Sequence, residues 1–223
     1  MSVDFPAIPF WSDEEIRTSL SGTIAHLNAR RVLAYPTETV YGFGGGVDQD
    51  SVDNLVSLKS RPKGKPFLML IAGVDMLGRL DLHLPPYAAA IAARFWPGPV
   101  TLVLPGGERR VPEALRGPEG GIGVRWTSHR GLNTLIRAYG DPITSTSANR
   151  PGTPAADSAT TVVHDWRDAI ARGMLRVLDG GKLVPSPPST VVDCMGVRPR
   201  VIRPGAVPAE ALRAAAPTLV PLG

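Results

Sequence analysis

Four cationic residues crowd into the short segment 59–65 of this chain, where they alternate with serine, proline and glycine. They are Lys59, Arg61, Lys63 and Lys65. Ammonium and guanidinium groups donate to phosphate oxygens, and the planar guanidinium fork suits two of those oxygens at once. Pro62 and Pro66 restrict the backbone that carries these donors. Taken alone, the pattern favours a solvated basic turn, and a phosphate-binding segment is the alternative that depends on the rest of the sequence.

A second polar cluster, Ser145-Thr-Ser-Ala-Asn149, follows the strand expected at 143–145. Open α/β sheets commonly bind ligands where their strands end. If the segment is extended, alternation places Ser145, Ser147 and Asn149 on one face. A turn in which Ser and Asn bond their own backbone is the alternative. From these residues alone, the ligand site and the turn remain open.

Other kinds of site find little support. Gly44 to Gly46 are not followed by the Gly-Lys-Ser/Thr of a phosphate loop and lack the spacing of the dinucleotide fingerprint, so a simple connection is the better interpretation. The four histidines show no metal-ligand spacing, and we expect surface or boundary positions for all of them; no protein-held metal site is predicted. The histidines are His26, His83, His129 and His164.

Cys194 is the single cysteine, which excludes an intramolecular disulfide. A lone cysteine in an apolar run is typical of a buried core residue.

Length and charge bound the class of protein. The chain has 223 residues, a net charge of +4 and a pI near 9.6, which suit anionic ligands such as nucleotides or RNA. No apolar run reaches the roughly 20 residues that span a bilayer, and the first residues do not resemble a signal peptide. We expect a single domain over residues 1–223, a cytoplasmic location and no membrane partner.

Helices and strands alternate along the chain, which predicts an α/β fold. Ser12-Asp-Glu-Glu15 forms a capping box for a helix over 12–28, and Ser51 and Ser128 are the expected N-caps of two further helices. Pro62 ends the helix that begins near Ser51, so the basic segment follows the C-terminus of that helix. Further helices are expected at 86–95 and 209–215. Strands are expected at 31–35, 67–72, 100–104, 122–125, 143–145, 175–178, 190–193 and 201–203.

Seven ordered motifs between about residues 30 and 207 closely resemble the YrdC-type family. They are Pro36-Thr-Glu-Thr-Val-Tyr-Gly42, Leu58-Lys-Ser-Arg-Pro62 with Lys65-Pro66, Phe95-Trp-Pro-Gly-Pro-Val-Thr-Leu-Val-Leu104, Gly123-Val-Arg125, Ser145-Thr-Ser-Ala-Asn149, Ser189-Thr-Val-Val-Asp193 and Arg203-Pro-Gly-Ala206. The resemblance implies a twisted, open, mixed sheet flanked by helices, with a basic concave groove.

Enzymes of this family are L-threonylcarbamoyladenylate synthases, so the resemblance implies a nucleotidyltransferase. Such an enzyme makes threonylcarbamoyl-AMP and pyrophosphate from L-threonine, bicarbonate and ATP, with Mg²⁺ beside the ATP. It further implies residue roles. The residues that resemble ATP contacts are Lys59, Arg61, Lys65, Ser147, Asn149 and Arg203, of which Lys59 and Arg61 are the candidate catalytic residues. The residues that resemble threonine contacts are Thr39, Arg125, Ser145 and Ser189.

The implied product feeds a downstream tRNA threonylcarbamoyl transferase, and direct contact with RNA or tRNA is a further possible partnership. Two positions depart from the family pattern: Pro188 stands where many members carry Glu, and Leu70 where some place a polar residue. Two alternatives are kept. One is a carbamoyl-adenylating enzyme that uses carbamoyl phosphate, and the other is an RNA-binding or ribosome-associated module without catalysis.

Overall fold

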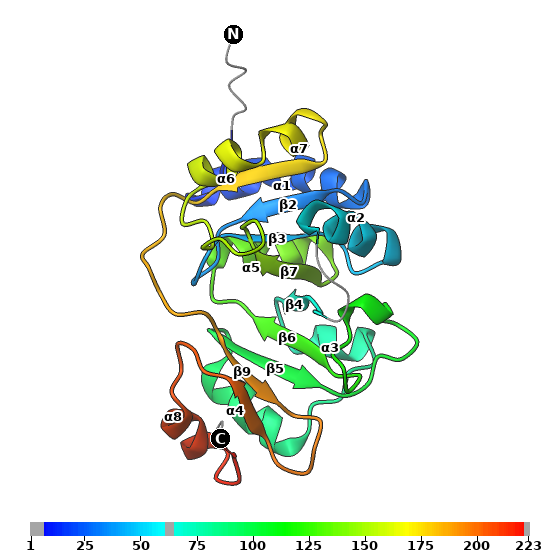
Figure 1. The fold of residues 1–223 in the computed structure, drawn as a ribbon, viewed down its shortest axis with the longest axis vertical. Helices are drawn as coiled ribbons and strands as arrows, with labels where there is room; N and C mark the ends of the chain where they lie inside the picture. The colour runs from blue at the N-terminus through cyan, green and yellow to red at the C-terminus, as the bar shows by residue number, and fades with distance from the viewer. Residues whose placement is uncertain (1–6, 61–64, 221–223) are drawn as a thin grey trace.

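The computed structural model describes residues 7–60 and 65–220, whose elements are labelled in Figure 1. The strands are β1 Ile8–Pro9, β2 Val32–Tyr35, β3 Gly42–Gly44, β4 Leu68–Ile71, β5 Val100–Leu104, β6 Ile122–Trp126, β7 Ile143–Ser147, β8 Leu175–Asp179, β9 Thr190–Asp193 and β10 Arg200–Arg203. The helices are α1 Asp13–Asn28, α2 Gln49–Lys59, α3 Asp75–Arg79, α4 Pro86–Phe95, α5 Arg130–Tyr139, α6 Ala159–Asp165, α7 Arg167–Ala171 and α8 Ala209–Ala215, with a short 3-10 helix at Glu113–Leu115.

Within the described residues the strands form one ten-stranded sheet in the order β1-β8-β2-β3-β7-β4-β6-β5-β9-β10. The sheet is mixed and open. For example, β2 runs parallel to β8, whereas β7 is antiparallel to both of its neighbours, β3 and β4. The predicted α/β class with a mixed sheet and flanking helices is confirmed.

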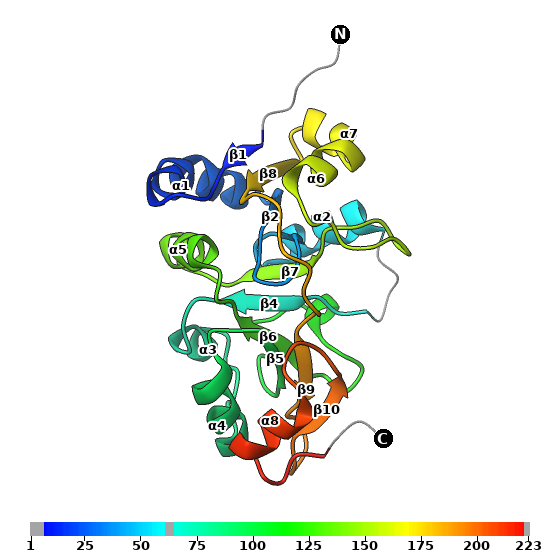
Figure 2. The same ribbon diagram turned by 90° about the vertical axis from the view of Figure 1, so that its left-hand side faces the viewer.

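The helices cover the two faces of the sheet unequally. Figure 2 shows α1, α5, α3 and α4 along one side, while α2, α6 and α7 lie on the other side near β2 and β8. On β5, Val100, Leu102 and Leu104 are fully buried, as expected for a face that packs under α4. Thr101 and Val103 alternate with them and point to the opposite face. That opposite face, around β5, β6 and β7, is where a cavity opens.

Several predicted helix boundaries are confirmed. The Ser12 hydroxyl accepts from Glu15 N at 3.2 Å, and the Glu15 carboxylate accepts from Ser12 N at 2.8 Å, so the capping box that begins α1 is present. Pro86–Phe95 and Ala209–Ala215 are helices with the predicted bounds.

Two predicted caps are wrong. Asp48, not Ser51, caps α2: its carboxylate accepts from Ser51 N at 3.1 Å, and the Ser51 hydroxyl donates to the same carboxylate at 2.6 Å. The N-cap of α5 is His129 rather than Ser128, because the His129 ring accepts from Leu132 N at 3.2 Å. In both cases a ring or carboxylate acceptor near the predicted serine takes the capping role, so the helix begins at a different residue.

The glycines at 44–46 were expected to form a simple connection, and for Gly44 this is wrong. Gly44 belongs to β3, a strand that the sequence analysis missed. A Cβ on Gly44 would lie 1.8 Å from the Thr144 carbonyl oxygen and 2.6 Å from the Tyr35 hydroxyl oxygen. The absent side chain is therefore what lets β3 approach β7 closely.

His26 also differs from expectation, because it is buried rather than at a surface or boundary. Its ring Nε2 lies 2.9 Å from the Val32 carbonyl oxygen. Burial, together with the charges of Arg176 and Arg31, lowers the pKa of His26 to about 4. Cys194 is buried as predicted, and burial raises its pKa to about 12. Across the described ranges, no helix has both the length and the apolar character to cross a membrane.

Candidate functional site

A cavity of about 760 Å³ lies on the open face of the sheet. Its floor follows the period of two that β-strands impose, because alternate residues of neighbouring strands reach it. These alternate residues are Thr101 and Val103 of β5, Gly123 and Arg125 of β6, Ser145 and Ser147 of β7, and Val191 and Asp193 of β9. The walls are formed by the loop after β2, by Ser189 just before β9, and by Arg203 at the end of β10.

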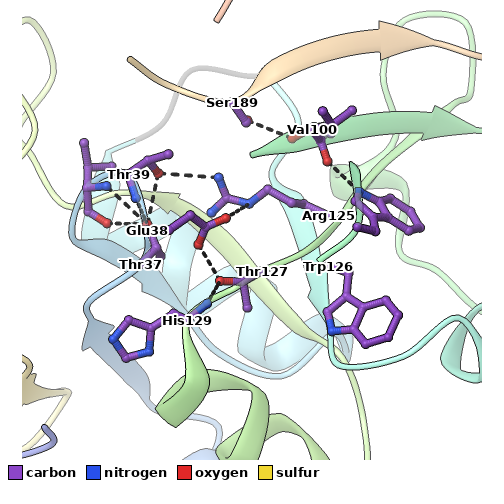
Figure 3. Close-up of polar contacts among 12 residues, drawn as sticks. Thr37, Glu38, Thr39, Val100, Arg125, Trp126, Thr127, His129 and Ser189 are labelled. Atoms are coloured by element: carbon purple, nitrogen blue, oxygen red, sulfur yellow. Dashed lines mark hydrogen bonds and ion pairs between the residues drawn. The ribbon is translucent and has the colours of Figure 1, made fainter. Parts of the chain in front are cut away.

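Hydroxyl groups and a buried guanidinium form one side of the cavity (Figure 3). The Thr37 and Thr39 hydroxyl oxygens lie 3.0 Å apart, and Nη1 of Arg125 is 3.4 Å from the Thr39 hydroxyl oxygen. Only 4% of Arg125 is exposed. Thr37 Oγ1 also accepts from the backbone of Thr39 at 3.1 Å, which fixes the loop after β2. This side of the cavity therefore offers pre-placed donors suited to a carboxylate.

A second guanidinium faces the cavity from β10. Arg203 donates through Nη2 to the Ser189 carbonyl oxygen at 2.8 Å and to its hydroxyl oxygen at 3.0 Å. The Ser189 hydroxyl in turn lies 2.9 Å from that of Thr101. Burial, and then the neighbouring charge of Arg125, lower the pKa of Arg203. Two guanidinium groups that repel each other line one cavity, and an anion bound there would relieve that repulsion.

Lys59 does not line this cavity but lies against the turn that follows β7. It is the last residue of α2, only 5% exposed, and its Nζ donates to the Ser147 carbonyl oxygen and the Asn149 Oδ1, each at 2.9 Å. It also contacts the Asn149 carbonyl oxygen. The Ser147 hydroxyl donates to Asn149 Oδ1 at 2.6 Å. The Lys-containing and Ser-x-Asn motifs, 88 residues apart, thus form one hydrogen-bonded unit.

The structure brings most of the sequence-predicted residues together. Six of them line the cavity: Thr39, Arg125, Ser145, Ser147, Ser189 and Arg203. Lys59 and Asn149 lie in the adjacent turn. Lys65 is exposed and directly precedes Pro66 and Phe67, which line the cavity. Arg61 lies outside the described residues, as does Lys63.

Sequence reasoning missed several polar residues of this region, among them Thr37, Glu38 and Thr101. Thr37 and Thr101 line the cavity, and Glu38 forms an ion pair with Arg125. Thr37 and Glu38 directly precede Thr39 in a motif that had been singled out, and Thr101 is the one polar residue in the strand Val100–Leu104. Position in the motif or strand could have pointed to Thr37 and Thr101, whereas nothing local separates the role of Glu38 from that of its neighbours. Among the two departures from the family pattern, Pro188 lines the cavity, whereas Leu70 is fully buried beside Arg125 in the β4–β6 register.

No group of three or more histidine, cysteine or acidic side chains that could hold a metal ion occurs within residues 7–60 and 65–220. Asp193 lines the cavity, but its carboxylate lies 3.1 Å from the Arg200 guanidinium. A Mg²⁺ ion typically keeps water ligands and is held largely by substrate phosphates. The side chains present therefore fit a metal ion that arrives with a nucleotide better than one held by the protein alone.

These features define an α/β protein with an arginine- and hydroxyl-lined cavity on the open face of a mixed sheet. Residues 25–205 match the Sua5/YciO/YrdC family model, which carries the description "Telomere recombination". The chain belongs to this family.

Its relatives include proteins named threonylcarbamoyl-AMP synthase. The Pyrococcus abyssi protein is 37% identical over 181 residues, which are 81% of this chain and 52% of that protein. The Bacillus subtilis protein is 35% identical over 192 residues, which are 85% of this chain and 54% of that protein. The chain thus spans about half the length of these two relatives. The crystal structure of P. abyssi Sua5 complexed with L-threonine superposes with a TM-score of 0.86 at 31% identity, covering 97% of this chain and 62% of that one.

Proposed function

We propose that this protein is a threonylcarbamoyl-AMP synthase, which joins L-threonine, bicarbonate and ATP into threonylcarbamoyl-AMP and pyrophosphate. The observation that carries the proposal is the cavity that gathers Arg125, Arg203 and the hydroxyls around them. Support comes from the family, from relatives that bear this name, and from the similar P. abyssi protein complexed with L-threonine.

We assign the amino-acid end of the cavity to the side built by β6, β7 and the loop after β2. Arg125 would hold the threonine carboxylate, because a buried guanidinium forms short, directional bonds to that group. Thr39 and Ser189 supply hydroxyls, and Ser145 supplies its backbone beside them. Each of these residues lines the cavity, so a single small molecule can reach all of them.

We assign the ATP end to the β7 turn and to the basic segment after α2. The residues in this assignment are Lys59, Arg61, Lys65, Ser147, Asn149 and Arg203. Lys59 acts here by holding the turn that presents Ser147 and Asn149, while charge neutralisation by Lys59 and Arg61 remains their predicted catalytic role. Together these cations would make the groove basic, as the family resemblance implies.

In the proposed reaction, the threonine amine joins bicarbonate with loss of water to give a carbamate. An oxygen of the carbamate carboxylate then attacks the α-phosphorus of ATP in line, and pyrophosphate leaves. Both reactants are anions, so the arginines must offset their repulsion before the atoms can meet. Mg²⁺ would enter with the ATP and neutralise phosphate charge. We assign no general base, and catalysis rests on positioning and electrostatics.

We further propose that the whole chain folds as a single domain and acts in the cytoplasm. Threonylcarbamoyl-AMP is a reactive mixed anhydride, so an acceptor enzyme must consume it, and the class that fits is a tRNA threonylcarbamoyl transferase. The mild positive charge of the chain would also allow direct contact with tRNA.

Threonine-dependent release of pyrophosphate from ATP and bicarbonate tests the proposal. We expect release only when all three substrates are present. Arg203→Gln should raise the KM for ATP, whereas Arg213→Gln on α8, an arginine outside the cavity lining, should leave it unchanged.

Absence of threonine-dependent release by the wild-type protein would overturn the proposal. Release that requires carbamoyl phosphate would favour the carbamoyl-adenylating alternative, and salt-sensitive RNA binding without turnover would favour the RNA-binding one.

A further inference from the structure

We propose that Glu38 is a positioning residue that fixes the guanidinium of Arg125 for an α-carboxylate, and that Thr127 holds Glu38 in place. The inference rests on the proposed function, because it concerns the threonine end of the same cavity. Glu38 lies between the two threonines of the loop after β2. The family resemblance assigned it no role, and it is not among the residues that line the cavity. The role that we propose for Glu38 is argued from the contacts of its two carboxylate oxygens.

One oxygen of the Glu38 carboxylate is fixed to the start of α5. The Thr127 hydroxyl donates to Glu38 Oε2 at 2.5 Å, and the backbone N of His129 donates to the Thr127 hydroxyl oxygen at 3.1 Å (Figure 3). Thr127 is fully buried, and His129 is the N-cap of α5. The carboxylate is therefore tied to the short connection between β6 and α5, which the bond from His129 N to the Thr127 hydroxyl oxygen holds in place.

The other oxygen of Glu38 faces Arg125. Glu38 Oε1 lies 3.8 Å from Arg125 Nε, and both side chains are largely buried, with exposed fractions of 16% and 5%. The ion pair lies at the inner edge of the guanidinium, whose outer end is directed toward the Thr39 hydroxyl, 3.4 Å from Nη1. A guanidinium attracted at its inner edge and bonded at its outer end presents an oriented fork, and such a fork favours planar carboxylates.

Stability does not explain this pair. Glu38 Oε1 and Arg125 Nε are both buried, and neither has a hydrogen-bond partner within the part of the chain that the structure describes. A buried ion pair whose facing atoms make no hydrogen bond to each other contributes little or nothing compared with apolar side chains of similar volume. Glu38 does offset one positive charge in a cavity that Arg125 shares with Arg203. The arrangement fits a role for Glu38 in orienting Arg125 and offsetting part of the positive charge of the cavity.

The test compares Glu38→Gln with the wild-type protein. The amide keeps the shape but loses the charge, so the KM for threonine should rise about tenfold, while the KM for ATP stays within about twofold. Calorimetry of threonine binding should show a loss of similar size. Thr127→Val should weaken threonine binding in the same direction, and Thr127→Ser, which keeps the hydroxyl, should restore it.

Glu210→Gln is the matched control, because Glu210 also pairs with an arginine at 3.8 Å but on the exposed surface of α8. It should change neither KM. A role limited to stability would lower the unfolding midpoint of Glu38→Gln without changing threonine affinity, and that result overturns the inference while leaving the proposed function intact. Wild-type protein that binds threonine but releases no pyrophosphate overturns the proposed function alone, since the binding series still decides on Glu38. Wild-type protein that does neither overturns both. If Glu38→Gln does not fold, unchanged threonine binding by Thr127→Val overturns the inference.

Discussion

The contact between Lys59 and Asn149 can be tested by a double-mutant cycle on stability. Lys59→Met keeps the length of the side chain but removes the ammonium group, and Asn149→Ala removes the Oδ1 acceptor that lies 2.9 Å from Nζ. A hydrogen bond from a charged donor contributes about 1.5–3 kcal/mol. We therefore expect a coupling free energy of about 2 kcal/mol between the two substitutions.

The single substitution Lys59→Met should cost more than this coupling, because it also removes donors from the carbonyl oxygens of Ser147 and Asn149. Those two losses occur whether or not the Asn149 side chain is present, so they cancel in the cycle. The assay is urea unfolding of the wild-type protein, both single variants and the double variant, with unchanged m-values as the check on two-state behaviour.

Additive single effects, within about 0.5 kcal/mol, would refute the reasoning, because residues that do not interact give additive changes. Such a result would mean that the basic segment and the Ser-x-Asn turn are not joined in solution. In that case the positioning role that we assign to Lys59 would be wrong, and a direct contact with ATP would be the one role left from our assignment.

Two further predictions concern the fold that carries the cavity. Gly44→Ala should destabilise the protein by about 3 kcal/mol, because a Cβ there would collide with backbone at 1.8 Å; Gly78→Ala, on an exposed helix where nothing lies within 4 Å, should instead stabilise it by about 0.5–1 kcal/mol. Equal urea midpoints for the two variants would contradict this. His26 has a folded-state pKa of about 4, below the ordinary value of 6.5, so between those pH values the unfolded state binds a proton that the native state does not. The wild-type protein should therefore lose up to about 3 kcal/mol as pH falls through this window, and His26→Gln, which cannot titrate, should show a correspondingly flatter dependence of its urea midpoint on pH.

The sequence predicted the elements with strong local signals. Ser12 and Glu15 cap α1 through their own side chains, and the proline at position 86 marks the start of α4, so both helices were located correctly. The start of α2 was misplaced because Asp48 and Ser51 are both good caps, and the competition between them is settled by their mutual hydrogen bond. The strand β3 was missed because its glycines carry no side-chain pattern. They become a strand by pairing with β2 on one side and with β7, about 100 residues further along the chain, on the other.

The same contrast between local signals and contacts with distant residues applies to the candidate site. Motif order placed Arg125, Ser145 and Ser189 in one cavity, since each motif carries its own residue types. Glu38 was not recognised, because its role depends on Thr127 and on Arg125, and both lie about 90 residues further along the chain. A residue that acts through another side chain leaves no local mark in the sequence.

The segment between β8 and β9 has a consequence for how the protein matures during synthesis. It carries the chain from beside β2, near one edge of the sheet, to β5, near the other edge. A nascent chain that has emerged as far as β8 already contains Arg125 and Ser145 but lacks Ser189 and Arg203. Ligands that need all of these residues can stabilise only the completed molecule, by mass action. An ample supply of such ligands would therefore protect finished copies from degradation while leaving partial chains to chaperones and proteases.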